Sequence, residues 1–125
     1  MNGTILIVDD SITMRKIILR TLKMAGVEFE TVLEAGDGNE ALVHLRANKV
    51  MLIMCDINMP VMDGLQLLQI IREEKLAYGV PIVMVTTENS EPQVRQAILY
   101  GARAYIRKPF SVEHIIDNVK PLLID

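Results

Sequence analysis

The chain alternates short apolar runs with stretches in which apolar residues recur every three or four positions, and it does so five times. An unbroken apolar run is typical of a strand buried on both faces, whereas the three-to-four spacing is typical of a helix with one buried side. The apolar runs predict strands over residues 4–8, 31–34, 51–55, 81–85 and 104–107.

The segments between these runs predict five helices, several of which begin at a capping residue. The first three cover residues 11–25, 38–47 and 65–74. The fourth follows a cap at Ser90, with Gln93 at the capping-box spacing, and ends near Gly101. The fifth follows Ser111 and must end or kink at Pro121, because proline has no backbone N–H to donate.

Five strands that alternate with five helices predict the α/β class, with a doubly wound, five-stranded parallel sheet and helices on both faces. Right-handed crossovers leave few ways to wind such a sheet. The chain has no internal repeat, low-complexity tract or linker. We therefore expect residues 1–125 to form a single domain, with no attached effector domain.

Composition and charge narrow the classes of function. Thirteen basic and sixteen acidic residues give a net charge of −3, and there is no Trp, which argues against direct binding of nucleic acid. The single cysteine, Cys55, excludes an internal disulfide and is typical of the cytoplasm. No apolar run reaches the roughly 18 residues of a transmembrane helix, so membrane insertion is not expected.

Polar side chains follow the predicted strands at the edge where parallel strands end and where open sheets bind ligands. Asp9 and Asp10 follow the first strand, Asp56 the third, Thr86 the fourth and Lys108 the fifth. Three carboxylates and one ammonium leave a charge of −2, which favours a hard divalent cation such as Mg²⁺. With no obvious His or Cys nucleophile at this edge, a carboxylate is the best candidate nucleophile, forming an aspartyl-phosphate.

These residues together resemble the receiver domains of response regulators in two-component signalling systems. The resemblance covers the whole chain and rests on Asp9-Asp10, on Asp56 within Asp-Ile-Asn-Met-Pro, and on Met62-Asp63-Gly64, Val85-Thr86 and Lys108-Pro109-Phe110. It implies the flavodoxin-like strand order 2-1-3-4-5. The segments Thr13-Met14-Arg15 and Ala104-Tyr105 are most similar to the single-domain chemotaxis regulators of this family.

The resemblance implies a phosphoacceptor and a metal site. Asp56 would accept a phosphoryl group from a histidine kinase. Asp9, Asp10, Asp56 and the backbone carbonyl of Asn58 would hold Mg²⁺, for which Mn²⁺ is a plausible substitute. The side chain of Asn58 would also influence how fast the phosphoryl group is hydrolysed.

The resemblance also implies a switch that responds to the phosphoryl group. Thr86 and Lys108 would contact it, and Tyr105 would change rotamer as Thr86 moves. Thr87 and Glu88 would tune the rate of hydrolysis. The output face, over residues 91–123, would then bind a partner such as a component of the flagellar motor switch, and a phosphatase would be a further partner of this monomer.

Other functions remain open beside control of chemotaxis. A single-domain receiver could instead serve as a phosphorelay intermediate or as a phosphate sink outside chemotaxis. A more remote alternative is a small Mg²⁺-dependent phosphatase that works through an aspartyl-phosphate. The haloacid-dehalogenase phosphatases place a second Asp two residues after the nucleophile, and here Asn58 occupies that position. The sequence therefore favours a switch rather than a turnover enzyme.

Overall fold

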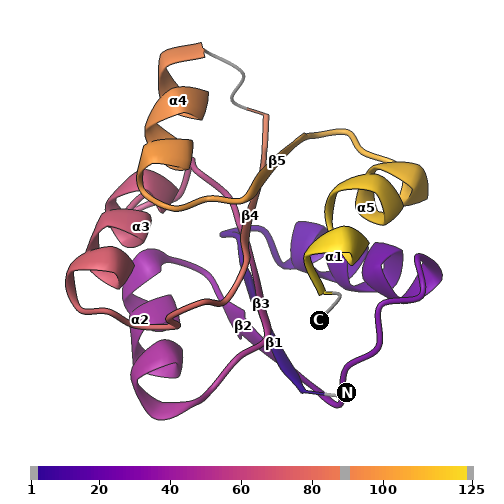
Figure 1. The fold of residues 1–125 in the computed structure, drawn as a ribbon, viewed down its shortest axis with the longest axis horizontal. Helices are drawn as coiled ribbons and strands as arrows, with labels where there is room; N and C mark the ends of the chain where they lie inside the picture. The colour runs from indigo at the N-terminus through magenta and orange to yellow at the C-terminus, as the bar shows by residue number, and fades with distance from the viewer. Residues whose placement is uncertain (1–2, 88–90, 124–125) are drawn as a thin grey trace.

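Strands and helices alternate along the chain in the computed structural model, which describes residues 3–87 and 91–123 (Figure 1). The strands are β1 (Thr4–Val8), β2 (Thr31–Ala35), β3 (Leu52–Cys55), β4 (Ile82–Thr86) and β5 (Ala104–Arg107). The helices are α1 (Ile12–Met24), α2 (Gly38–Ala47), α3 (Gly64–Glu73), α4 (Glu91–Leu99) and α5 (Val112–Asn118), and a 3₁₀ helix, η1 (Lys120–Leu123), follows. The α/β fold predicted from the sequence is confirmed.

The five strands form one parallel sheet in the order β2-β1-β3-β4-β5, as predicted. β1 lies between β2 and β3, so that Ile7 is opposite both Glu34 and Met54. After β1 the chain forms β2 on one side of it and then crosses over to form β3 on the other side. This reversal creates the topological switch point between β1 and β3. Helices α1 and α5 cover one face of the sheet, and α2, α3 and α4 cover the other (Figure 1).

Each face of the sheet has its own apolar core, which explains why the strands are unbroken apolar runs. Leu6 and Val8 of β1 belong to the core under α2 and α3. Ile5 and Ile7 belong to the core under α1 and α5. Because successive side chains of a strand point to opposite faces, a strand covered on both sides needs an apolar residue at every position.

Capping residues set the helix starts. Ser11 caps α1, and Ser111 caps α5. Asp63 caps α3 in a reciprocal capping box with Gln66. These starts agree with the sequence predictions, whereas the predicted cap at Ser90 lies outside the described residues. Along the described part of the chain, no helix is long and apolar enough to cross a membrane.

Several element ends differ by a residue or more from the sequence predictions, and two of these differences have a clear physical reason. β4 continues through Thr86, which was expected to follow the strand, because β5 pairs with it there. Helix α5 ends at Asn118, before Pro121, and the chain continues as the 3₁₀ helix η1. Proline can neither donate a backbone hydrogen bond nor fit against the preceding helical turn, so the α-helix cannot continue through Pro121.

Candidate functional site

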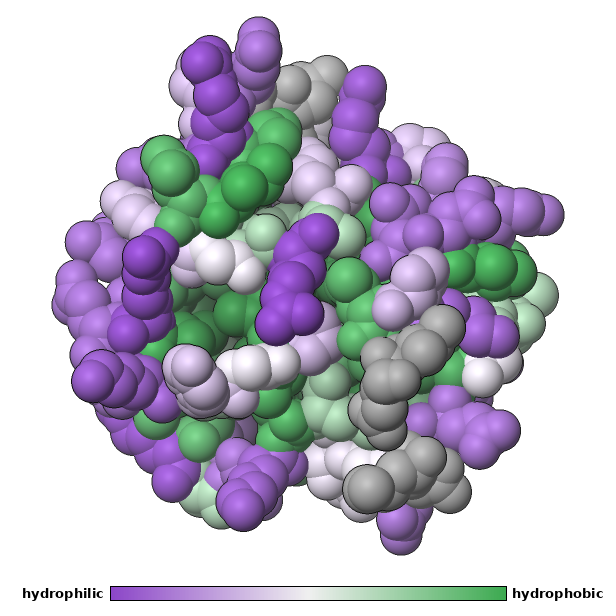
Figure 2. Space-filling view, viewed as in Figure 1, coloured by the Kyte–Doolittle hydropathy of each residue, from purple (hydrophilic) through white to green (hydrophobic). Residues whose placement is uncertain are grey.

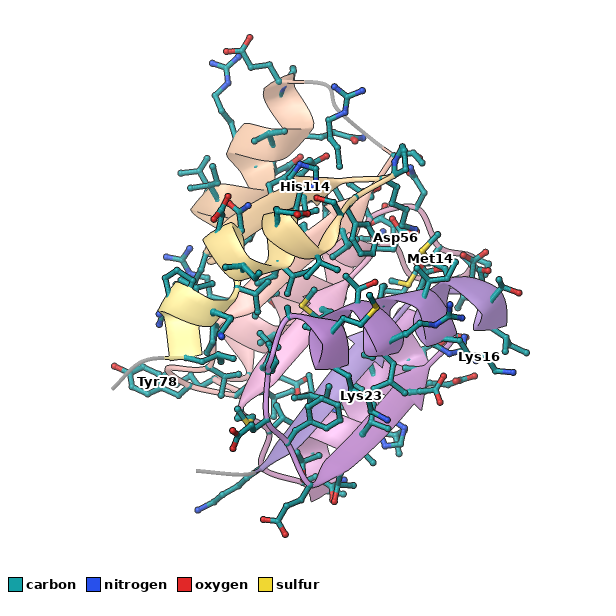
Figure 3. The ribbon with its side chains drawn as sticks, turned by 90° about the vertical axis from the view of Figure 1, so that its right-hand side faces the viewer. Met14, Lys16, Lys23, Asp56, Tyr78 and His114 are labelled. Atoms are coloured by element: carbon teal, nitrogen blue, oxygen red, sulfur yellow. The ribbon has the colours of Figure 1, made fainter. Side chains whose placement is uncertain are left out.

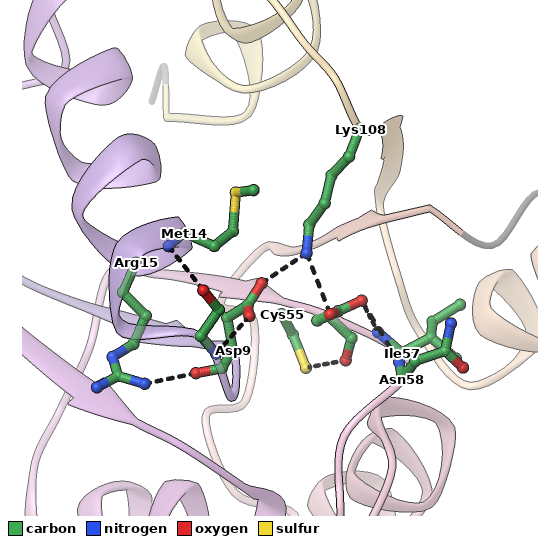
Figure 4. A network of polar contacts seen from close by, with 9 residues as sticks. Asp9, Met14, Arg15, Cys55, Ile57, Asn58 and Lys108 are labelled. Atoms are coloured by element: carbon green, nitrogen blue, oxygen red, sulfur yellow. Dashed lines mark hydrogen bonds and ion pairs between the residues drawn. The ribbon is translucent and has the colours of Figure 1, made fainter.

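Asp56 lies directly after β3, at the carboxyl edge of the sheet. Its backbone N–H donates to the carbonyl of Val8 on β1 at 2.9 Å, which ties the residue to the centre of the sheet. Its Oδ1 accepts hydrogen bonds from the backbone N–H groups of Ile57 (2.7 Å) and Asn58 (3.4 Å) (Figure 4). With 7% of its surface exposed, Asp56 is buried but reachable from this edge.

Asp9 and Asp10 follow β1 at the same edge. Asp9 is 1% exposed, its backbone N–H donates to the carbonyl of Ala35, and its Oδ1 accepts from the backbone N–H of Ser11 at 2.9 Å. Asp10 is exposed. One carboxylate oxygen from each of Asp9, Asp10 and Asp56 lies within 4.8 Å of the other two. Carboxylate oxygens at this spacing fit a hard divalent cation such as Mg²⁺.

Lys108 brings an ammonium group from the end of β5 into this acidic cluster. Its Nζ lies 2.7 Å from Oδ2 of Asp9 and 3.1 Å from Oδ2 of Asp56 (Figure 4). The side chain of Lys108 is 11% exposed. Its backbone N–H donates to the carbonyl of Thr86 at 2.9 Å, so the end of β4 positions it. The structure therefore joins four of the residues predicted from the sequence: Asp9, Asp10, Asp56 and Lys108.

Burial and charge act in opposite directions on this cluster. Burial lowers the pKa of Lys108, but the hydrogen bond to Asp9 and the charges of Asp56 and Asp9 outweigh it and raise that pKa. Lys108 therefore stays protonated and positively charged. Burial also raises the pKa of Asp9, opposed in part by the hydrogen bond from Lys108. Two carboxylates about 4 Å apart repel by roughly 4 kcal/mol at an effective dielectric near 20. Since the cluster holds three carboxylates and one ammonium, Lys108 alone does not neutralise its charge.

The two residues predicted to relay the signal lie beside the cluster. Thr86 is fully buried at the end of β4, next to the strand that carries Lys108. Tyr105 is half-buried on β5, opposite Met84. Their positions are compatible with a switch, but their movement stays a prediction.

The residues predicted to tune hydrolysis lie at the rim. Asn58 is exposed two residues after Asp56, and Thr87 is exposed after the end of β4. Glu88 lies outside the described residues. The roles of all three stay predictions, as does metal binding by the backbone carbonyl of Asn58.

Comparison with known proteins decides the family. A family model described as the response regulator receiver domain matches residues 5–120. The chain is a response regulator receiver domain. The resemblance inferred from the sequence motifs is thereby confirmed.

Individual relatives of this receiver domain are chemotaxis proteins. It is 42% identical over 120 residues to a chemotaxis protein CheY homolog of Campylobacter jejuni, a match that covers 95% of this chain and 91% of the relative. It is 40% identical over 120 residues to chemotaxis protein CheY1 of Helicobacter pylori, which covers 95% of both chains. Among solved structures, CheY4 of Vibrio cholerae is similar with a TM-score of 0.83 and 35% identity, covering 98% of this chain and 100% of the other.

Arg15 is a residue of this receiver domain for which the sequence analysis gave no role. Its Nη1 donates to the backbone carbonyl of Asp9 at 2.6 Å, and its Nε donates to Oε1 of Glu34 at 2.8 Å. The side chain is 14% exposed. Arg15 therefore links the loop that carries Asp9 to the edge strand β2. The sequence did contain a signal for this contact. Arg15 lies near the start of α1, where a cation interacts unfavourably with the helix dipole and a nearby anionic partner is favoured.

Gly64 is a second residue whose contribution to the receiver site emerges only from the structure. It is the first residue of α3, and its N–H donates to the carbonyl of Ile57 at 2.7 Å. A Cβ at this position would lie 2.1 Å from the backbone oxygen of Asp56. Gly64 thus begins the helix and also lets α3 approach the backbone of Asp56 closely.

Cys55 precedes Asp56 and lies in the core of the receiver domain. Its side chain is buried, and its Sγ donates to the carbonyl of Asp56 at 3.2 Å. Burial raises the pKa of the Cys55 thiol, and the nearby charges of Asp56 and Asp9 raise it further. A thiol held protonated in this way is a poor nucleophile, so Cys55 is an inert residue of the core.

Proposed function

We propose that this receiver domain is a signalling switch in which Asp56 accepts a phosphoryl group from a phosphohistidine of a histidine kinase. The observation that carries the proposal is the arrangement around Asp56. A backbone N–H holds its Oδ1 at 2.7 Å, the ammonium of Lys108 lies 3.1 Å from its Oδ2, and Asp9 and Asp10 complete a cluster that can hold a cation.

The proposed transfer needs a carboxylate nucleophile and positive charge around the phosphorus. A carboxylate oxygen of Asp56 forms a bond to phosphorus while the P–N bond to the imidazole breaks. The bonding electron pair stays on the imidazole nitrogen, which then takes a proton from solvent. The ammonium of Lys108 balances negative charge on the phosphoryl oxygens, and the hydroxyl of Thr86 donates a hydrogen bond to one of them.

We propose Mg²⁺ as the cation of this site, with Mn²⁺ as a substitute. Asp9, Asp10, Asp56 and the backbone carbonyl of Asn58 would hold it, which matches the preference of both ions for oxygen ligands. Mg²⁺, when bound, supplies further positive charge to the phosphoryl oxygens.

The aspartyl-phosphate is then reset by water rather than passed through a catalytic cycle on a substrate. Asn58 occupies the position where a turnover phosphatase of the haloacid-dehalogenase type has an acidic residue, so no general acid is placed there. Asn58, Thr87 and Glu88 would set the rate of hydrolysis, and a separate phosphatase can accelerate it. We therefore propose that each molecule is phosphorylated and then returned to its starting state by hydrolysis, as a switch, and that the chain does not turn over a substrate as an enzyme does.

The phosphoryl group would change the output face over residues 91–123. It shifts an existing two-state equilibrium, because Thr86 and Lys108 contact it better in the active state, and Tyr105 follows Thr86. The relatives named chemotaxis proteins support chemotaxis as the pathway. We propose a flagellar motor switch component as the partner. The switch would act in the cytoplasm as a monomer, and its independence from an effector domain stays a prediction.

The proposal is tested by intact mass after incubation with acetyl phosphate, with and without Mg²⁺. One phosphoryl group should be gained only with Mg²⁺, and Asp56→Asn should abolish the gain. Asp63→Asn is the matched control, because asparagine caps a helix as well as aspartate does and Asp63 lies outside the cluster. A gain that persists in Asp56→Asn, or none at all in a folded protein that binds Mg²⁺, would refute the acceptor role.

The coupling to the output face is tested by the ring signals of the tyrosines in NMR spectra. Phosphorylation should change the signals of Tyr105 in the wild type but not in Thr86→Ala. Tyr78, which is 92% exposed in the loop between α3 and β4, is an internal control that should not change. A response of Tyr105 that survives in Thr86→Ala would exclude Thr86 as the link.

The pathway is tested in cells that lack this chain. Control of the motor predicts that swimming cells lose their normal reversals, and that Asp56→Asn fails to restore them. Normal reversals in the deletion strain would contradict the chemotaxis assignment and favour a phosphorelay intermediate or a phosphate sink.

A further inference from the structure

A cavity of about 390 Å³ lies at the edge of the sheet opposite to the acidic cluster. It is formed where α3 and α4 end, around the start of β4, and so at the amino ends of the strands rather than the carboxyl ends. Figure 3 shows Tyr78, one of its lining residues, at the end of the molecule away from Asp56. Nothing in the proposed phosphorylation chemistry uses this cavity.

The charged side chains that line the cavity are all cationic: Arg72, Lys75 and Arg103. Within the described ranges 3–87 and 91–123, none of them has a carboxylate within 4.0 Å. Both guanidinium groups are anchored to the backbone, that of Arg72 by the carbonyl of Leu99 and that of Arg103 by the carbonyl of Gly79. Because a guanidinium has five N–H donors, each keeps donors for a ligand.

Two tyrosine rings lie beside these cations. Tyr78 is 92% exposed, so almost its entire ring is available to a ligand. Tyr100 follows α4, and its hydroxyl oxygen accepts a hydrogen bond from Gln96 at 3.2 Å, which restrains the ring. Flat aromatic rings stack on tyrosine more favourably than aliphatic groups do, and this arrangement adds an aromatic surface to a cationic cavity.

The loop that carries Lys75 and Tyr78 has an unusual backbone. Lys75 (φ 56°) and Ala77 (φ 48°) are both in the left-handed region, which residues with a Cβ rarely adopt. Gly79 (φ 78°) adds a third left-handed residue within five positions. The left-handed Lys75 closes α3, because its N–H and that of Leu76 donate to the carbonyls of Arg72 and Ile71, so this backbone fixes the start of the loop that lines the cavity.

We propose that this cavity binds a small anion made of a flat aromatic ring and a phosphate group, the chemistry of a nucleoside monophosphate. The phosphate is held by the donors of Arg72, Arg103 and Lys75, and the ring stacks against Tyr78 and Tyr100. The volume lies within the range of small-molecule sites, about 300–1,000 Å³. With three cations and no carboxylate in the lining, the cavity attracts an anion and repels a cationic ligand.

The test uses the full chain without Mg²⁺ and three probes: AMP, adenosine and ribose 5-phosphate. Amide signals in NMR spectra are followed during each titration. AMP should move the signals of residues 72–80 and 100–103, with a Kd at least about tenfold lower than either fragment, since it alone makes both kinds of contact. Lys75→Asn should raise the Kd for AMP about tenfold, because it removes one charged contact. Asparagine tolerates the left-handed backbone, so the loop is kept.

Two further variants separate the parts of the site. Tyr78→Ala should weaken AMP and leave ribose 5-phosphate unchanged, because an almost fully exposed ring contributes nothing to the core. Lys16→Ala, an exposed cation on α1 far from Tyr78 in Figure 3, should change neither probe. The proposal is overturned if AMP moves only signals around Asp56 and Lys108, if Lys75→Asn binds AMP as well as the wild type does, or if ribose 5-phosphate binds as tightly as AMP.

Discussion

Replacement of Gly64 by alanine should destabilise the protein, although alanine is the better helix former. An added Cβ would lie 2.1 Å from the backbone oxygen of Asp56 and 2.8 Å from the Cα of Ile57. The first distance is about 1.3 Å short of the 3.4 Å at which ordinary contact begins. Both atoms belong to the backbone, so no side chain can rotate away, and α3 or the loop that carries Asp56 must move.

Three contributions set the change in the free energy of unfolding: the first stabilises the variant, and the other two destabilise it. Helix propensity alone would stabilise Gly64→Ala by up to about 1 kcal/mol. Overpacking costs roughly 1–3 kcal/mol, and moving α3 weakens the hydrogen bond from Gly64 to Ile57, which contributes about 1 kcal/mol. The expected net loss is therefore about 2 kcal/mol, which for a chain of this size lowers Tm by roughly 6–10 °C.

Thermal and urea unfolding followed by circular dichroism measure this loss. Gly36→Ala is the matched control, because a Cβ there would lie 3.7 Å from the side chains of Arg15 and Glu40, an ordinary contact. Its stability should stay within about 0.5 kcal/mol of the wild type. Phosphorylation of Asp56 should also slow in Gly64→Ala only. An alanine variant at Gly64 that equals or exceeds the wild type in stability would show that helix propensity wins and that the close approach is not needed.

Three further changes test other parts of the site. Lys108→Met removes the cation between Asp9 and Asp56, so Mg²⁺ should bind severalfold more tightly in calorimetry; unchanged or weaker binding would contradict the charge balance described above. Arg15→Ala leaves the carbonyl of Asp9 without its donor, and it should cost about 1–3 kcal/mol in urea unfolding and weaken Mg²⁺ binding, whereas an effect on neither would make the contact incidental. Because the pKa of Cys55 is raised, a thiol reagent should not label the native protein from neutral to mildly alkaline pH but should label it in denaturant; rapid native labelling would mean that this residue is accessible.

The elements and the acidic edge were predictable because they depend on local pattern and on the rule that parallel strands end at one edge. Unbroken apolar runs indicated strands covered on both faces, and the residues after those runs, such as Asp9, Asp56 and Lys108, had to meet. The details that depend on contacts between distant segments were not predictable in this way. Nothing local to Arg15 names Glu34 as its partner. Nothing local to Gly64 shows that α3 passes within van der Waals distance of the backbone of Asp56.

The conformation of the loop between α3 and β4 is another feature that the sequence pattern does not predict. A left-handed backbone at Lys75 and Ala77 has no signature in residue type, since neither residue favours that conformation. The cations that line the cavity come from α3, from this loop and from the segment before β5. Only the packing of α3 and α4 at the amino edge of the sheet brings them together.

Under the proposed function, the ion pairs of Lys108 also determine when during synthesis this protein could first respond to a signal. Its partners Asp9 and Asp56 lie 99 and 52 positions earlier in the chain. Ion pairs between residues this distant in sequence can form only after the intervening chain has been made and β5 has paired with β4. A nascent chain that still lacks β5 has its carboxylates but no ammonium beside them. Under the proposed function, kinases would thus load only finished molecules, and phosphorylation would report completed folding as well as the signal.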